Sequence, residues 1–216
     1  SMLVLACKYI HSTQLPNVQE ATDVFLDTAL EIGEGQQYDM NFETRTDVTT
    51  DEYIEMIRLK TSVLIACALK MGAIFSNATP EVANELYSFG EQVGLAFQLQ
   101  DDLLDVYGDP KVFGKRIGGD ILCNKKTFLL INAYQKANAE QKKALEHWIK
   151  IDNYDDAEKI AAVTDIYNQL GIKEYTGKVI DKYFDNARTI IDNIDLPQAN
   201  KQPLWDFAAQ LVNRNY

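Results

Sequence analysis

The spacing of apolar residues constrains the fold of this chain more than any other feature. Val18, Phe25, Ala29 and Ile32 follow one another at intervals of seven, four and three residues, which places them on one face of an α-helix. Similar helical patterns recur along the chain, and no internal repeat or low-complexity tract interrupts them. We therefore expect an all-α fold, a single helical domain over residues 1–216, with roughly eight helices and no β-strand.

Capping and breaker residues divide this pattern into helices. The second helix should end at the glycine-bearing sequence GEGQQYD, which would leave Gln36 and Asp39 just beyond a helix end in capping or structural roles. Thr49 and Glu52 have the spacing of a capping box, and Pro80 suits a first helical turn. The expected helices cover residues 3–11, 18 to the glycines, 50–75, 80–107, 125–136, a segment capped by Asn138 and Gln141, 155–170, 173–194 and 203–213.

Charge and cysteine content narrow the class of function. Asp and Glu number 32 and Lys and Arg 21, so the net charge of -11 disfavours nucleic acid as a partner. Cys7, Cys67 and Cys123 are widely spaced and form no CxxC motif, which favours a reduced, cytoplasmic protein. The longest uncharged apolar run, Thr61 to Leu69, is about half a membrane span, so we expect no spanning helix.

An acidic cluster lies within the helix expected over residues 80–107. At about 100° per residue, Gln98, Asp101, Asp102 and Asp105 fall in one sector roughly 100° wide. Apolar residues occupy nearly every other direction around this helix, which indicates that the acids line an interior cleft. A solvent-exposed acidic stripe is the alternative.

The three aspartates need a positive partner, because like charges four residues apart repel one another, and repel more strongly in a desolvated cleft. No lysine or arginine occurs between Lys70 and Lys111. A divalent cation is therefore the simplest partner, and carboxylates without His or Cys nearby favour Mg²⁺, particularly where phosphate oxygens share the ligation. We expect Asp101, Asp102 and Asp105 to bind this ion.

The strongest basic cluster of the chain follows the aspartates. The glycine-rich sequence GDPKVFGKRIGGD predicts a flexible loop that carries Lys115 and Arg116, and Lys125 and Lys126 come soon after it. An acidic helix beside a basic loop suggests a diphosphate bridged by metal ions. The alternative is that these residues lie in a solvated loop and bind no ligand. This alternative carries more weight for Arg116 and Lys126 than for Lys115 and Lys125.

A second candidate site lies in RLKTSVLIACALKMGAIF, where Lys60 and Thr61 stand at the entry to a nearly all-apolar run. If that run is buried, Lys60 needs an anionic partner, and a diphosphate oxygen would serve. The alternative is a lysine whose aliphatic stem packs on the helix while its ammonium reaches water.

Three sequence blocks together resemble one known family. GEGQQYDM, RLKTSVL and GLAFQLQDDLLDVYGDPKVFGKRIGGDILCNKKTFLL resemble, in order and spacing, conserved blocks of the trans-isoprenyl diphosphate synthases, which include the farnesyl and geranylgeranyl diphosphate synthases. The resemblance covers essentially the whole chain, although its C-terminal part matches only as a helical pattern. It implies an isoprenoid-synthase-type helical bundle around a central cavity, and a homodimer in the intact protein.

The resemblance also implies a reaction, head-to-tail prenyl transfer with Mg²⁺ as cofactor. In the family, an allylic diphosphate ionises and its carbocation alkylates isopentenyl diphosphate, after which the departing diphosphate accepts the proton that is lost. The matching positions here are Asp101, Asp102 and Asp105 for the metal, Lys60, Lys115 and Lys125 for the allylic diphosphate, and Lys60, Thr61 and Gln98 for stabilising the carbocation through oxygen dipoles. Among the metal residues, Asp101 would be the main direct ligand.

The sequence departs from the family pattern in two places. It contains neither the family's first DDxxD motif with its arginine pair nor the upstream lysine and arginine that hold isopentenyl diphosphate. We therefore expect an N-terminally truncated portion of a synthase, inactive on its own. Cys123 also stands where the family usually has an acid.

Two other functions remain open. One is a noncatalytic regulatory subunit of a heteromeric prenyl synthase, and the other is a class I terpene cyclase of similar fold. Intact Lys60, Gln98 and aspartates favour a synthase over the subunit, and the absence of an Asn/Ser/Glu-type metal motif argues against the cyclase.

Overall fold

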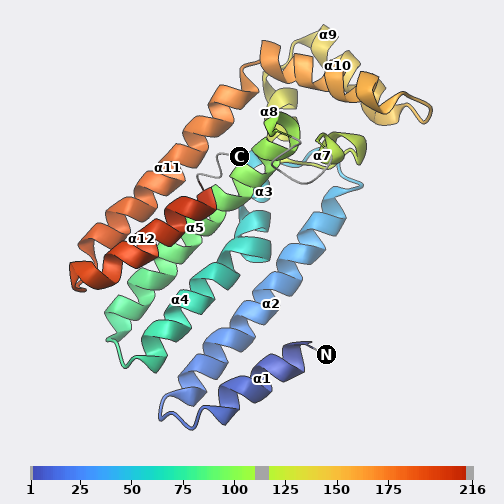
Figure 1. Ribbon diagram of the computed structural model, residues 1–216. Helices are drawn as coiled ribbons and strands as arrows, with labels where there is room; N and C mark the ends of the chain where they lie inside the picture. The colour runs from blue at the N-terminus through green and yellow to red at the C-terminus, as the bar shows by residue number, and fades with distance from the viewer. Residues whose placement is uncertain (1, 110–116, 213–216) are drawn as a thin grey trace.

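Long helices lie side by side in the computed structural model, which describes residues 2–109 and 117–212. Figure 1 shows α2, α4, α5, α11 and α12 running along the body of the molecule, with α7, α8, α9 and α10 gathered at one end. The elements are α1 (Met2–Ser12), α2 (Val18–Phe42), α3 (Thr50–Ile57), the π-helical η1 (Arg58–Ser62), α4 (Val63–Phe75), α5 (Pro80–Tyr107), α7 (Gly119–Leu122), α8 (Phe128–Lys136), α9 (Ala139–Lys150), α10 (Asp156–Gln169), α11 (Ile172–Asn193) and α12 (Gln198–Val212).

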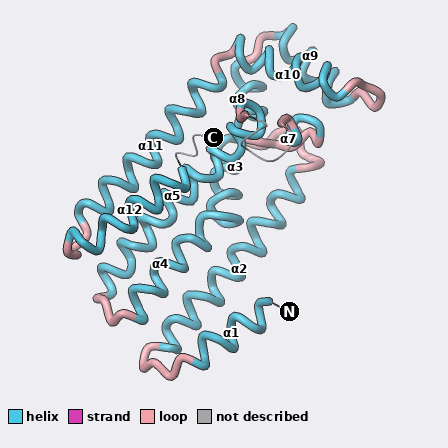
Figure 2. Tube along the Cα trace, viewed as in Figure 1, coloured by secondary structure: helices cyan, strands magenta, loops and turns pink. Residues whose placement is uncertain are grey.

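The all-α prediction is confirmed, since none of the described residues forms a β-strand (Figure 2). The central helix is α5, which packs on α4 along one side and on α11 along another. Most of its apolar side chains are buried as expected, with Leu86, Phe89, Val93, Leu99 and Val106 each no more than 8% exposed. Phe97, Leu103 and Leu104 are partly exposed. The C-terminal end of α5 meets α3, α7 and α8 at the crowded end of the bundle.

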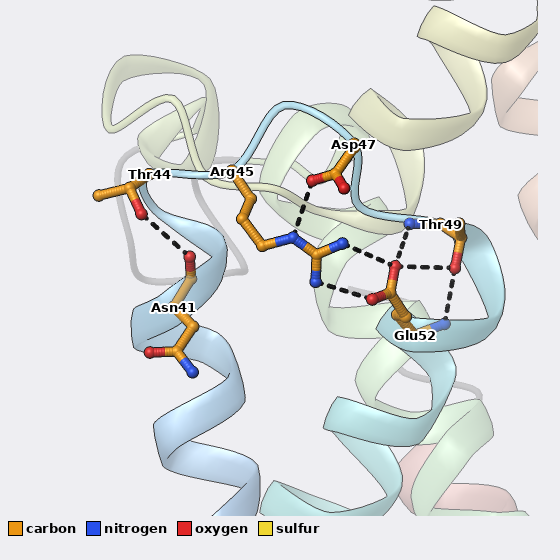
Figure 3. Close-up of polar contacts among 6 residues, drawn as sticks. All are labelled: Asn41, Thr44, Arg45, Asp47, Thr49 and Glu52. Carbon is orange, nitrogen blue, oxygen red and sulfur yellow. Dashed lines mark hydrogen bonds and ion pairs between the residues drawn. The ribbon is translucent and has the colours of Figure 1, made fainter.

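The start of α3 forms as its sequence predicts. The Thr49 side chain accepts a hydrogen bond from the Glu52 backbone N–H at 3.2 Å, and the Glu52 carboxylate accepts one from the Thr49 backbone N–H at 2.8 Å. The Arg45 guanidinium also forms ion pairs with the carboxylates of Asp47 and Glu52 (Figure 3). This network fixes the connection between α2 and α3, from which the chain continues through η1 and α4 to Phe75.

The predicted end of the second helix is wrong. Helix α2 continues through GEGQQYD to Phe42, so Gln36 and Asp39 lie inside the helix and cap nothing. Gly33 and Gly35 cost the helix some stability relative to alanine. Packing outweighs that cost, because Gly35 is buried where α2 contacts Leu59 and Lys60.

Other helix ends follow their signals closely. Thr79 and Pro80 open α5, a capping box of Asn138 and Gln141 opens α9, and Gly171, with a φ of +64°, separates α10 from α11.

Helix α12 begins at Gln198, ahead of the predicted position 203, and Pro203 lies within it. Its first turn is held by Lys201, whose Nζ donates to the Asp192 carbonyl at 2.7 Å.

Helix α8 begins at Phe128, three residues later than expected, because Thr127 is its N-cap and accepts from the Leu130 N–H at 3.3 Å. Lys125 consequently lies in the turn before α8 rather than on a helix.

Within the described ranges, no helix combines the length and apolarity needed to cross a membrane.

Candidate active site

Two glycines allow α2 and α5 to pack closely against η1. A Cβ atom on Gly35 of α2 would lie 2.5 Å from the backbone nitrogen of Lys60, and one on Gly94 of α5 would lie 2.5 Å from Cα of Ser62. No larger residue fits at either position without displacing backbone. The π-helical segment is therefore held between α2 and α5, and this segment carries Lys60 and Thr61. Such π-helical turns are often found at functional sites.

Lys60 has a carboxylate partner within the fold. Its Nζ lies 2.6 Å from Oδ2 of Asp39, and the two side chains are 34% and 24% exposed. The anionic partner that sequence analysis required for a buried lysine is thus present in α2. Because both side chains remain partly accessible, the Lys60 ammonium is still able to contact an anionic ligand.

Thr61 and Gln98 are linked to Asp102 by hydrogen bonds. The Thr61 hydroxyl donates to Oε1 of Gln98 at 3.1 Å, and Nε2 of Gln98 donates to Oδ1 of Asp102 at 3.2 Å. The hydroxyl of Tyr53, from α3, donates to the other oxygen of Asp102. These contacts join η1, α5 and α3, and they hold the side chains of Thr61 and Gln98 in place.

Asp102 lies in the core, where it is only 1% exposed. Burial raises the pKa of this carboxyl to about 7, although Lys125 and the Tyr53 hydroxyl favour its ionised form. The predicted acidic face is therefore divided: Asp102 is enclosed, whereas Asp101 and Asp105 are partly exposed. The same enclosure raises the pKa of Tyr53 well above its ordinary value, because burial and the neighbouring carboxylate both disfavour the phenolate.

Asp105 binds the segment that follows the glycine-rich loop. Its Oδ2 accepts a hydrogen bond from the Asp120 backbone N–H at 2.9 Å, and its backbone carbonyl accepts one from the Gly118 N–H at 2.6 Å. Gly118 has a φ of +82°, a conformation that glycine adopts without strain. Helix α7 is thereby fixed against the C-terminal end of α5, but partial burial still raises the pKa of Asp105.

Lys125 completes the charged cluster. Its Nζ lies 3.3 Å from the carboxylate of Asp120. Burial by itself would lower the pKa of Lys125, but the carboxylates of Asp102, Asp120 and Asp39 more than offset it, and the pKa is raised. The cation is therefore retained in a region where acids predominate.

The partly exposed donors at this end of α5 suit a hard cation. Asp101 and Asp105 offer carboxylate oxygens, the donor type that Mg²⁺ prefers. Across residues 2–109 and 117–212, no group of three or more His, Cys, Asp or Glu side chains could hold a metal ion by itself. The donors present thus fit an ion that completes its coordination with oxygens from water and a bound ligand, as Mg²⁺ commonly does.

Some predicted residues fall outside this cluster, and some residues of the cluster were not predicted. Lys115 and Arg116 lie outside the described residues. Tyr53 and the pairing of Asp39 with Lys60 were missed, because each contact joins helices that are separated in sequence. Asp120 was also missed. A weak signal existed for Asp120, an acid between the loop glycines and Lys125.

Comparison with known proteins places this geometry in a family. The family model for polyprenyl synthetases matches residues 1–168. A short chain isoprenyl diphosphate synthase of Methanothermobacter thermautotrophicus is 40% identical over 162 residues, which are 75% of this chain and 49% of that protein. The chain thus spans about half the length of this curated relative.

Solved structures agree with the sequence match. A crystal structure of a geranylgeranyl pyrophosphate synthase superposes with a TM-score of 0.92 at 38% identity, covering 100% of this chain and 67% of that one. The Corynebacterium glutamicum geranylgeranyl pyrophosphate synthase, solved with isoprenyl diphosphate and magnesium, gives a TM-score of 0.84 at 28% identity, covering 92% and 56%. By its sequence and by its helical fold, the chain belongs to the polyprenyl synthetase family.

Proposed function

We propose that the full-length protein containing this chain condenses an allylic diphosphate with isopentenyl diphosphate, head to tail, with Mg²⁺ as cofactor. The observation that carries the proposal is a cluster drawn from separate parts of the chain. Thr61 and Gln98 are linked to Asp102 of α5, and the charge of Lys125 is favoured by Asp102 and by Asp39, the partner of Lys60. The synthases to which the chain is similar are named for isoprenyl diphosphate products, and one was solved with magnesium.

The cationic side chains would hold the allylic diphosphate. Lys60 is paired with Asp39, neighbouring carboxylates raise the pKa of Lys125, and Lys115 is assigned the same role on the resemblance alone. Asp101 and Asp105 would bind Mg²⁺, while Asp102 would support them from within the core. Bound there, the ion would neutralise charge that develops on the departing diphosphate.

The positive charge that develops on the allylic substrate also needs stabilisation. When the allylic C–O bond breaks, its electron pair leaves with the diphosphate and a carbocation remains. Thr61, Gln98 and the Lys60 carbonyl would direct oxygen dipoles at that cation in a site shielded from water. The double bond of isopentenyl diphosphate then supplies the electrons of the new C–C bond, and the departing diphosphate accepts the proton that is lost.

The proposal is tested by incubating the full-length protein with labelled isopentenyl diphosphate and allylic diphosphates of increasing length. We expect longer prenyl diphosphates to form in Mg²⁺ and not in excess EDTA. Failure of every allylic primer to be extended would contradict the proposed reaction, and equal product with EDTA would contradict the metal requirement.

We also propose that the full-length protein is a cytoplasmic homodimer. Helices α1 and α2 carry large apolar side chains that are exposed in the single chain, including Val4 at 68% and Leu30 at 69%. A second copy would remove such surface from water. Light scattering of the full-length protein should give twice the chain mass, and a monomer mass at micromolar concentration would exclude a stable dimer.

A further inference from the structure

One buried lysine lies beside the site without contacting it. Lys159 of α10 is only 1% exposed. None of its hydrogen bonds in the described part of the chain goes to a carboxylate. Its Nζ donates to Oδ1 of Asn124 at 2.7 Å and to the Leu122 carbonyl at 3.5 Å. The ammonium also lies 4.3 Å from the centre of the Tyr154 ring.

The two acceptors of Lys159 are the last residue of α7, Leu122, and Asn124 in the turn between α7 and α8. Asn124 has a φ of +53°, a left-handed conformation that few residues other than glycine and asparagine adopt easily. Its side chain is held from two directions, since Nδ2 donates to the Ile149 carbonyl at 3.2 Å while Oδ1 accepts from Lys159. The turn is thus fastened to α9 and α10 by side-chain hydrogen bonds.

The residue that follows Asn124 in this turn is Lys125. Its backbone N–H donates to the Asp120 carbonyl at 3.0 Å, and its own carbonyl accepts from the Thr127 N–H at 2.9 Å. These bonds set the direction in which the Lys125 side chain leaves the backbone, toward Asp120. A change in the Asn124 conformation would therefore redirect Lys125.

The packing leaves the turn little room to move. A cavity of only about 20 Å³ borders Asn124, Lys125 and Lys159, enough space for roughly one water molecule. Burying an ammonium is costly unless its hydrogen bonds are satisfied. The hydrogen bonds of Lys159 go to the last carbonyl of α7 and to the Asn124 side chain, so they hold the end of α7 and the turn together.

We propose that Lys159 is a positioning residue for the diphosphate site: through Asn124 and the Leu122 carbonyl it fixes the turn that directs Lys125 toward the ligand. The inference deepens the proposed function and rests on it for the identity of the ligand. Lys159 itself contacts no substrate.

The hold of Lys159 on the turn is tested first without ligand, by amide hydrogen exchange in the full-length protein. Lys159→Met keeps an unbranched side chain of similar length and removes the donor. We expect faster exchange at the amides of Cys123, Asn124 and Lys125, all of which are hydrogen-bonded in the turn. Unchanged exchange there would overturn the proposal. Lys201→Met is the matched control, because Lys201 is 9% exposed and donates to a carbonyl in another part of the fold.

The effect on the site is measured as the affinity for inorganic diphosphate in Mg²⁺ by titration calorimetry. Lys159→Met should weaken binding about threefold to tenfold, the range expected when one hydrogen bond no longer holds a charged ligand contact, and Lys201→Met should not change it. Asn124→Gly, which tolerates the positive φ but lacks the side chain, should weaken binding to the same extent. This second variant keeps the test decisive if Lys159→Met folds poorly.

A double-mutant cycle distinguishes positioning from a general structural role. If Lys159 acts through Lys125, Lys159→Met should add nothing to the loss of affinity already caused by Lys125→Ala. Additive losses would contradict the proposal. If the wild-type protein bound no diphosphate, the proposed function would fail. The exchange experiment would still decide whether Lys159 holds the turn in place.

Discussion

At the scale of single residues, the three aspartates of α5 have different surroundings. Asp102 is enclosed and accepts hydrogen bonds from Tyr53 and Gln98, Asp105 accepts a backbone N–H from α7, and Asp101 is partly exposed. The DDxxD spacing therefore combines one carboxylate that orders the core with two at its edge. On this account Asp102 orients Gln98, and through Gln98 it orients Thr61.

The hydrogen bond from Tyr53 to Asp102 should contribute measurably to stability. Tyr53→Phe removes the only donor from α3 described for this buried carboxyl, and an unsatisfied buried acceptor costs about 1–3 kcal/mol. Urea unfolding should show a loss of that size. Tyr9→Phe is the control, because Tyr9 is 65% exposed. Equal stability of the two variants would show that the buried hydrogen bond contributes nothing.

Residue identities were easier to predict than their contacts. The spacing of Gln98 and the aspartates along one helix follows from sequence, because helix geometry depends only on positions nearby in the chain. Burial of Asp102 against Tyr53 depends on how α3 crosses α5, and Asp39 reaches Lys60 only because α2 does not end at its glycines. Such contacts depend on tertiary packing, which local patterns do not determine.

At the scale of elements, the π-helical segment is held by close contact with α2 and α5. Gly35 and Gly94 allow this contact, since a Cβ on either would collide with backbone atoms of η1. The glycine-bearing sequence that suggested a helix end is instead a packing surface. A local signal for termination was outweighed by burial, which no local pattern reveals.

Alanine at these glycines should destabilise the fold. Gly35→Ala and Gly94→Ala should each cost roughly 1–3 kcal/mol through overpacking. Gly33→Ala is the control in the same helix, because no atom lies within 4 Å of its Cβ position, and it should stabilise by roughly 0.5–1 kcal/mol through helix propensity. Chemical denaturation measures all three. A stabilising effect at position 35 would mean that η1 is not in close contact with α2.

The start of α3 should show a defined pH dependence. Hydrogen bonds from Arg45 and from Thr49 lower the pKa of Glu52 below its ordinary value of 4.5. Because the folded state has the lower pKa, the contribution of Glu52 is present above that ordinary value and is lost as the pH falls through the folded pKa. Glu52→Gln should therefore melt at a lower temperature than wild type near neutral pH, and the difference should vanish in strong acid. A difference that persists at about pH 2 would exclude this electrostatic origin.

At the scale of the whole molecule, the bundle gathers charged residues at one end. The crowded end in Figure 1 joins the C-terminal part of α5 to α3, α7 and α8, and α2 contributes Asp39 through its contact with η1. The all-α class, the long central helix and the order of the site residues were all predictable from sequence. How α10 fastens the turn before Lys125 was not, because it depends on a buried lysine in a stretch with no recognisable motif.

The central claim is that the partly exposed carboxylates of α5, Asp101 and Asp105, hold Mg²⁺ and, through it, the departing diphosphate. It is tested most directly by Mg²⁺-dependent turnover of full-length Asp101→Ala, with the exposed loop variant Asp152→Ala as control. Asp101→Ala should lower turnover by about a hundredfold or more while the helical circular dichroism is unchanged, and Asp152→Ala should behave as wild type. Wild-type turnover by Asp101→Ala would contradict the account.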